Sequence, residues 1–185
     1  MRKMVVRALV AAASAATALL LTTTGAQASV QPGEVDPVFD RPAATAASAD
    51  VGPYVTKLSH SEATSRLRSS GITWSSSGNC SDRNNPTCTS FSQVNLATIQ
   101  GAQTLKSASG CALNITGGTE TGHASGTYSH WNGYKLDYSL YSCVGNYIRN
   151  NFSYIGGNKW QSGSGNIYFL ESNHWDVTYY NCGGC

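Results

Sequence analysis

Two short stretches of the chain contain residue types that can bind a metal ion and transfer a proton. The first, Ser129–Asp137 (S-H-W-N-G-Y-K-L-D), contains His130 and, seven residues later, Asp137. The second, E-S-N-H, places Glu171 three residues before His174. Two imidazoles and one carboxylate can bind zinc and leave its fourth position to water, so we predict that His130, Asp137 and His174 are zinc ligands. Glu171 would then accept a proton from the water as it attacks a carbonyl group.

The elements that must position these residues are predicted from the pattern of apolar side chains. Gly133–Ser139 alternates between apolar and polar residues, which predicts a strand with Lys135 and Asp137 on the open face, away from the core. Ile167–Leu170 and Trp175–Tyr180 are rich in β-prone residues and flank the E-S-N-H stretch. We therefore expect a hairpin whose tight connection brings its glutamate and histidine toward the same point.

The segment 117–132 has no hydrophobic period and is rich in Gly, Thr, Ser and His. A loop of more than about 12–15 residues in a compact domain is usually functional or disordered. Because this loop contains His123 and His130, we interpret it as part of the site.

Two helices followed mainly by strands are predicted for the rest of the domain. Ser61–Ser70 is predicted to form a short helix, and a second helix is predicted to begin at Thr89 or Ser90, where apolar residues recur near helical spacing. Cys111–Thr116 alternates and predicts a strand, and Cys143–Asn150 predicts a short helix. This order indicates an α+β fold with a small antiparallel sheet and helices packed mainly toward the N-terminus.

The first 52 residues have the composition of targeting and leader segments. Residues 1–28 combine three basic residues, an apolar run and the small-residue pattern A-Q-A, which predicts a signal peptide cleaved after Ala28. Residues 29–52 are rich in Ala, Pro, Asp and Val without a period, and we interpret them as a disordered leader or a pro-segment that could shield a site. Residues 53–185 fit one domain with one core. We therefore expect a secreted protein.

The charge balance argues against nucleic acid as a partner. Removal of the predicted signal peptide leaves 9 of the 12 basic residues against 10 acidic ones, a net charge of about −1. The sequence contains no basic patch of the kind that nucleic acid requires. No other stretch is long and apolar enough to span a bilayer, so we expect a mature protein outside the membrane, and a monomer.

All six cysteines lie in the predicted domain: Cys80, Cys88, Cys111, Cys143, Cys182 and Cys185. An even number in an exported chain predicts three disulfides, for which 15 pairings exist. Cys80 and Cys88 could close a polar loop locally, and the two C-terminal cysteines could pair with each other or with Cys111 and Cys143. In a competing interpretation, Cys88 is a nucleophile at a helix N-terminus, as in papain-like amidases, but a free thiol would leave an odd cysteine.

The pattern S-H-x-x-G-x-x-x-D followed by E-x-x-H resembles the D-alanyl-D-alanine carboxypeptidase and dipeptidase family of zinc peptidases. The similar region is Thr116–Val177, and the family shares the hedgehog/DD-peptidase fold. The resemblance implies that zinc is bound by His130, Asp137 and His174. It also implies that Glu171 is the catalytic base and that the substrate is a stem peptide or cross-link of peptidoglycan, cleaved by a carboxypeptidase or an endopeptidase.

The chain departs from the pattern of that family at two positions. Lys135 stands where a small residue is expected, and the turn Thr116–Glu120 lacks the arginine that stabilises the oxyanion in family members. Catalysis would need another donor for the developing negative charge, and we hypothesise that Lys135 or His123 supplies it. The alternative is a non-catalytic, zinc-stabilised extracellular binding module. The presence of Glu171, which is not a ligand, argues against that alternative.

Overall fold

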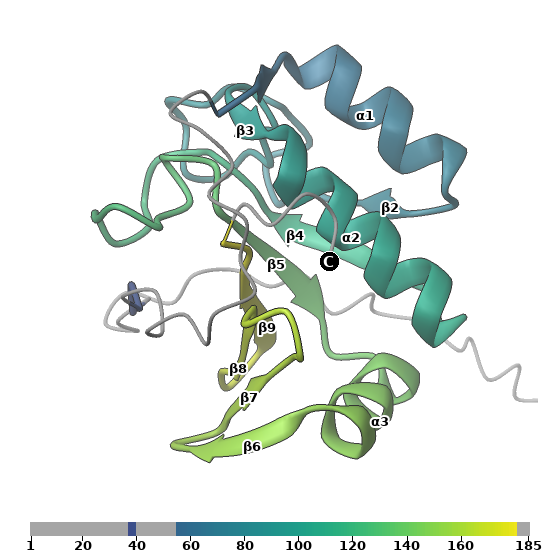
Figure 1. Cartoon of the computed structure of the whole chain (residues 1–185). Coiled ribbons are helices and arrows are strands. Elements are labelled where there is room, and N and C mark those ends of the chain that lie inside the picture. Colours follow the sequence, from purple (N-terminus) through teal and green to yellow (C-terminus); the bar gives the residue numbers. More distant parts are fainter. Residues whose placement is uncertain (1–36, 40–54, 181–185) are drawn as a thin grey trace, which may run out of the picture.

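The computed structural model describes residues 37–39 and 55–180. The predicted signal peptide, most of the leader, and Cys182 and Cys185 lie outside these residues. The described chain has an α+β architecture with three helices, a mixed seven-stranded sheet and a small two-stranded sheet (Figure 1). The helices are α1 (His60–Ser69), α2 (Leu96–Ser109) and α3 (Ser142–Asn151).

Helix α1 begins where its capping residues predict. The Ser59 hydroxyl accepts a hydrogen bond from the Glu62 backbone N–H at 3.3 Å, and the Glu62 carboxylate accepts one from the Ser59 N–H at 2.9 Å. This reciprocal pair satisfies two backbone donors that the first turn would otherwise leave without a partner. The predicted helix Ser61–Ser70 is confirmed to within one residue at each end.

Helix α2 begins later than predicted. It starts at Leu96, so the predicted start at Thr89 or Ser90 is wrong. The Ser90 N–H donates to the Glu120 carboxylate at 2.7 Å, and Gln93 has a φ of 66°, in the left-handed region that a right-handed helix cannot contain. The apolar spacing before Leu96 therefore reflects packing of an irregular segment against the core.

The strands of the large sheet are β2 (Thr73–Trp74), β4 (Asn114–Gly117), β5 (Lys135–Ser139), β6 (Ser153–Gly156), β7 (Lys159–Gln161), β8 (Ile167–Leu170) and β9 (His174–Thr178), and those of the small sheet are β1 (Lys57–Leu58) and β3 (Val94–Asn95). The order in the large sheet is β2-β4-β5-β9-β8-β7-β6. The predicted strand β5 and the predicted β8–β9 hairpin are confirmed, whereas the hairpin β6–β7 was not predicted.

The large sheet is mixed, so the expectation of an antiparallel sheet is wrong at one edge. Strands β2 and β4 are parallel, and the other neighbouring pairs in this sheet are antiparallel. Helix α2 lies between β2 and β4 in the chain. The chain thus returns along the helix and enters β4 in the same direction as β2, which is how parallel neighbours are connected.

One face of the large sheet packs against the helices. Leu136, Tyr138 and Val177 alternate on this face and are at most 1% exposed. Gly101 of α2 lies directly over the ring of Tyr179, where a side chain on the helix would clash. Helix α2 passes over β4 on this side of the molecule (Figure 1). The central strands are therefore held by the main core.

The opposite face of the sheet carries polar residues, but it is not open to solvent as predicted. Asp137 and Asp176 lie directly opposite each other in the β5–β9 pairing. Lys135 shares their face, and its side chain is 0% exposed and paired with the Asp176 carboxylate. The predicted alternation is confirmed, whereas the predicted exposure of Lys135 is wrong, because this face is covered.

Two disulfides form within the described residues, Cys80–Cys88 and Cys111–Cys143. The first closes a polar loop locally, as predicted, and the second joins the segment after α2 to α3. Cys88 is therefore not a free nucleophile, and the papain-like interpretation is wrong. Disulfides persist in oxidising compartments, so the structure indicates such an environment.

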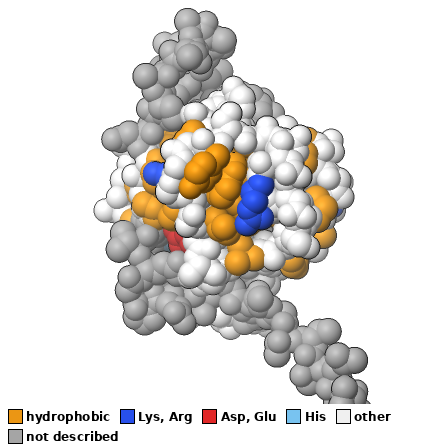
Figure 2. Space-filling view, turned by 90° about the horizontal axis from the view of Figure 1, so that it is seen from below, with side chains coloured by type: hydrophobic (Ala, Val, Ile, Leu, Met, Phe, Trp, Pro, Cys, Tyr) orange, Lys and Arg blue, Asp and Glu red, His pale blue; other side chains and the backbone are white. Residues whose placement is uncertain are grey.

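The outer surface near β6 contains exposed apolar side chains. Tyr154 and Ile155 of β6 are 60% and 47% exposed. Figure 2, which views the molecule from the β6 side, shows hydrophobic side chains beside Lys and Arg side chains. None of the described helices is long and apolar enough to span a bilayer.

We predict that removing the Cys111–Cys143 disulfide destabilises the fold more than removing Cys80–Cys88. In the chain-entropy view, closing loops of these two lengths (sequence separations of 32 and 8) contributes about 4 and about 2.5 kcal/mol. Denaturant unfolding of the two double Cys→Ser variants checks the order. Equal free energies of unfolding for the two variants would contradict this explanation.

Candidate metal centre

Three separate segments bring the predicted site residues together. His130 lies in the loop between β4 and β5, and Asp137 lies in the middle of β5. Glu171 and His174 lie at the ends of the β8–β9 connection, which is closed by a hydrogen bond from the Glu171 N–H to the His174 carbonyl at 3.0 Å. The four side chains are buried. The convergence expected from the strand pattern is therefore present.

The carboxylate of Asp137 is the point on which both histidines converge. His130 Nε2 lies 3.2 Å and His174 Nε2 lies 3.4 Å from Asp137 Oδ1. Glu171 Oε2 lies 3.4 Å from His174 Nε2. Within the described residues, Asp137 Oδ1 is buried and receives no hydrogen bond of good geometry despite these short distances.

The second ring nitrogen of each histidine determines which nitrogen carries the lone pair. His130 Nδ1 lies 2.6 Å from the Gly118 carbonyl, which can only accept, so Nδ1 carries the proton. His174 Nδ1 lies 2.5 Å from Asn173 Oδ1 and is held in the same way. In the neutral rings both Nε2 lone pairs then face a carboxylate oxygen. A cation between them relieves this repulsion, and a backbone or side-chain acceptor on the far nitrogen is typical of metal-binding histidines.

The electrostatics of the site keep Asp137 ionised. Burial raises the pKa of the Asp137 carboxyl, but positive charge on the neighbouring His130, His174 and His123 lowers it more, and the net pKa is well below its ordinary value. A deprotonated carboxylate is the form that binds a metal ion.

Gly117 makes room for this carboxylate. It lies opposite Asp137 in the β4–β5 pairing, and a Cβ at position 117 would lie 2.1 Å from Asp137 Oδ2. The neighbouring Gly118 is equally constrained, because its Cβ would lie 2.0 Å from the Ser90 carbonyl oxygen. Gly117, which the sequence marks only as a strand end, is thus required by the site, and Gly118 is required by the close approach of the Ser90 backbone.

His123 joins the site from the same loop. Its ring stacks on that of His130 with centroids 3.8 Å apart and an interplanar angle of 16°. Its Nδ1 lies 4.0 Å from Asp137 Oδ2, and its Nε2 lies 3.5 Å from Glu120 Oε1. His123, His130 and Asp137 form a buried group whose ligand atoms lie within 4.8 Å of one another and could hold a metal ion.

Lys135 is occupied elsewhere on the same sheet face. Its ammonium group contacts the Asp176 carboxylate, diagonally across the β5–β9 pair. Two carboxylates directly opposite each other, as Asp137 and Asp176 are, repel unless one of them is compensated. Lys135 compensates Asp176 and so leaves the Asp137 carboxylate to the histidines.

Two residues that sequence reasoning missed hold the loop of the site in place. The buried Glu120 carboxylate accepts hydrogen bonds from the backbone N–H groups of Ser90 and Gly118. Arg83 donates to the carbonyls of Thr119 and Trp131, and its guanidinium stacks 3.7 Å from the Trp131 ring. An acidic residue in a glycine-rich turn is a sequence signal that could have identified Glu120. No local pattern identifies Arg83.

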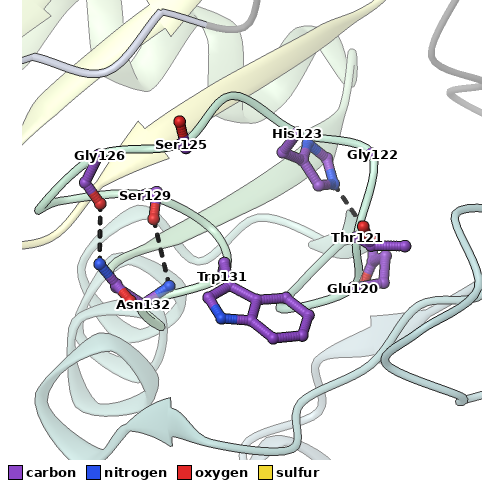
Figure 3. A pocket seen from close by; sticks show the side chains of 9 residues that line it. All are labelled: Glu120, Thr121, Gly122, His123, Ser125, Gly126, Ser129, Trp131 and Asn132. Carbon is purple, nitrogen blue, oxygen red and sulfur yellow. Dashed lines mark hydrogen bonds and ion pairs between the residues drawn. The ribbon is translucent and has the colours of Figure 1, made fainter.

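A pocket of about 240 Å³ opens beside this group (Figure 3). It is formed by the two ends of the loop, with Glu120 and His123 on one side and Trp131 and Asn132 on the other. Asn132 holds the far rim closed through hydrogen bonds to Gly126 and Ser129. The pocket therefore borders the site at His123.

The chain matches no protein-family model, no curated protein and no solved structure.

We predict that Gly117→Ala weakens metal binding, because its Cβ displaces the Asp137 carboxylate. Zinc affinity should fall about 10–100-fold, the range found when a metal ligand loses its orientation. Competition with a chromophoric chelator measures it. Gly163→Ala is the matched control, since a Cβ there meets no heavy atom within 4 Å. Equal zinc affinities of the two variants would show that Gly117 does not position the carboxylate.

Proposed function

We propose that this protein is a secreted zinc peptidase that hydrolyses peptide bonds in the stem peptides or cross-links of peptidoglycan. The observation that carries the proposal is the convergence of two imidazole Nε2 atoms on Asp137 Oδ1, with Glu171 beside them. The proposal assigns His130, Asp137 and His174 as the zinc ligands.

The two distances from Asp137 Oδ1 to the histidine nitrogens are compatible with zinc. Two ligand atoms that each lie about 2.0–2.1 Å from a zinc ion at a tetrahedral angle are about 3.3–3.4 Å apart. The distances of 3.2 and 3.4 Å between Asp137 Oδ1 and the two Nε2 atoms match this value. Nitrogen and oxygen ligands of this kind also suit zinc chemically.

His123 fits a different role from that of ligand. The lone pair of an imidazole nitrogen lies in the ring plane, so an ion bound by that nitrogen lies near that plane. Two rings stacked at 3.8 Å cannot both have one nearby ion in their planes. We therefore propose that His123 acts beside the metal, as a donor to the developing oxyanion, in place of the arginine that family members use. Lys135 fits this role less well because Asp176 holds its ammonium group.

We predict that His174→Ala abolishes stoichiometric zinc binding, whereas His123→Ala retains about one zinc ion per chain. The first change removes a ligand and the second removes a stacked neighbour. Metal content after gel filtration, measured by atomic emission, separates the two. Retention of zinc by His174→Ala together with loss from His123→Ala would assign the ligand set to His123, His130 and Asp137 instead.

Glu171 has the position and chemistry of a general base. Its carboxylate is buried and lies next to His174 Nε2, one of the proposed ligand atoms. When bound, zinc supplies a Lewis acid that lowers the pKa of a water molecule and polarises a carbonyl group. Glu171 then accepts the proton of the water and delivers it to the leaving amine.

The substrate class is supported by the resemblance of the two motifs to zinc D-Ala-D-Ala peptidases and by the environment that the disulfides indicate. The spacing S-H-x-x-G-x-x-x-D and E-x-x-H supplies the ligands and the base in the order used by that family. Two disulfides are consistent with an enzyme that works outside the cytoplasm.

We predict that Glu171→Gln keeps zinc and loses hydrolysis. The change removes the proton acceptor while preserving shape, and general bases contribute about 10²–10⁴-fold to rate. Release of D-Ala or of new amines from purified peptidoglycan measures turnover, with His130→Ala as the metal-free control. Full zinc occupancy with no turnover by the wild-type protein would favour the alternative, a zinc-stabilised binding module.

A further inference from the structure

Three residues of the leader, Pro37–Phe39, lie against the polar face of the sheet. The Lys135 ammonium group donates a hydrogen bond to the Pro37 carbonyl at 2.5 Å. The Tyr180 hydroxyl donates one to the Phe39 carbonyl at 3.3 Å. The segment is thus held through backbone carbonyls, which any extended peptide could supply.

The side chain of Phe39 is held by both aromatic and cationic groups. Its ring packs edge-to-face against Phe169 of β8, with centroids 5.6 Å apart and an interplanar angle of 79°. The ammonium groups of Lys135 and Lys159 lie 5.5 and 4.7 Å from its centroid. Such contacts attract an aromatic ring specifically.

Val38 connects this segment to the pocket beside the metal group. It packs on Gly126, where a Cβ would lie 2.7 Å from Val38 Cγ1. Gly126 also lines the pocket that contains His123 (Figure 3). The three leader residues therefore extend between the rim of the pocket and strand β8.

The segment also lies next to the metal ligand on β5. Lys135 is two residues from Asp137 on the same face of that strand. Its partner, Asp176, lies directly opposite Asp137 on β9. A peptide that follows the path of Pro37–Phe39 passes immediately beside the proposed zinc site.

We propose that Pro37–Phe39 occupies a peptide-binding subsite, and that the leader is an intramolecular ligand which excludes other peptides. The subsite takes an extended peptide that presents a backbone carbonyl to Lys135 and an aromatic side chain to Phe169 and Lys159. Binding at the subsite stands on these contacts alone. Only its consequence, inhibition of hydrolysis, rests on the proposed function.

The chemistry of Lys135 supports exchange of one peptide for another. An ammonium group has three N–H donors, and the Asp176 carboxylate keeps one of them oriented. The Pro37 carbonyl takes another. A carbonyl of an incoming peptide can replace that of Pro37 without loss of the Lys135–Asp176 pair.

A binding experiment tests the subsite directly. The probe is a fluorescein-labelled peptide with the sequence of residues 34–42, E-V-D-P-V-F-D-R-P, and its affinity is measured by fluorescence anisotropy. The full chain carrying Phe39→Ala should bind it about tenfold or more tightly than the wild type, because loss of the aromatic contacts frees the subsite. Tyr154→Ala, which removes an exposed ring on β6, should bind like the wild type. A peptide with Ala in place of Phe should not compete.

Chemical labelling of Lys135 gives an independent readout. Its amine is fully buried, so acetylation followed by mass spectrometry should find it protected in the wild type and labelled faster in Phe39→Ala. Excess probe peptide should restore protection. In Gly126→Ala the added Cβ would clash with Val38 and displace the segment Pro37–Phe39. This variant should therefore also expose Lys135. Equal probe affinity and equal Lys135 labelling in wild type, Phe39→Ala and Gly126→Ala would overturn the proposal.

Neither readout requires zinc or turnover. If peptidoglycan is not cleaved but Phe39→Ala binds the probe peptide more tightly, the subsite is supported and the proposed peptidase function is contradicted. If cleavage depends on Glu171 but Phe39→Ala and Gly126→Ala neither bind the probe more tightly nor expose Lys135, the peptidase function is supported and the subsite is contradicted.

Discussion

The candidate site depends on one buried carboxylate that faces two imidazole nitrogens. Asp137 lies on β5, between β4 and β9, where the sheet fixes its backbone on both sides. The histidines that meet it are oriented by acceptors on their far nitrogens. This arrangement is repulsive in the neutral rings unless a metal cation or a proton lies among the three groups. Most other features of the site can be understood as a means of keeping it in place.

The neighbouring residues supply that support through volume and charge. Gly117 leaves the space that the carboxylate fills, and Lys135 neutralises the second carboxylate, Asp176, on the same face. The loop from β4 to β5 has little regular structure, so side chains must tie it down. Glu120 does so from within the loop, and Arg83 does so from the disulfide-closed loop before it.

The sequence predicted the elements that carry the candidate site because their signals are local. Alternation of apolar and polar residues identified β5, and two runs of β-prone residues identified the β8–β9 hairpin. These elements place Asp137, Glu171 and His174. The predicted start of the second helix failed because Ser90 and its neighbours are fixed by Glu120, thirty residues away. The role of Lys135 was missed for a similar reason. Its partner Asp176 comes from the register of two strands, which no local pattern contains.

The covered face of the sheet has a consequence for how the protein responds to cutting of its own chain. Pro37–Phe39 is tethered to the domain, so a contact of modest intrinsic strength acts at an effective concentration on the order of millimolar. A competing peptide must exceed that concentration to enter. Cleavage of the backbone anywhere between residues 40 and 54 would remove the tether and leave the same contact as an ordinary bimolecular one, which dissociates on dilution. Access to the face is therefore governed by the integrity of one covalent connection.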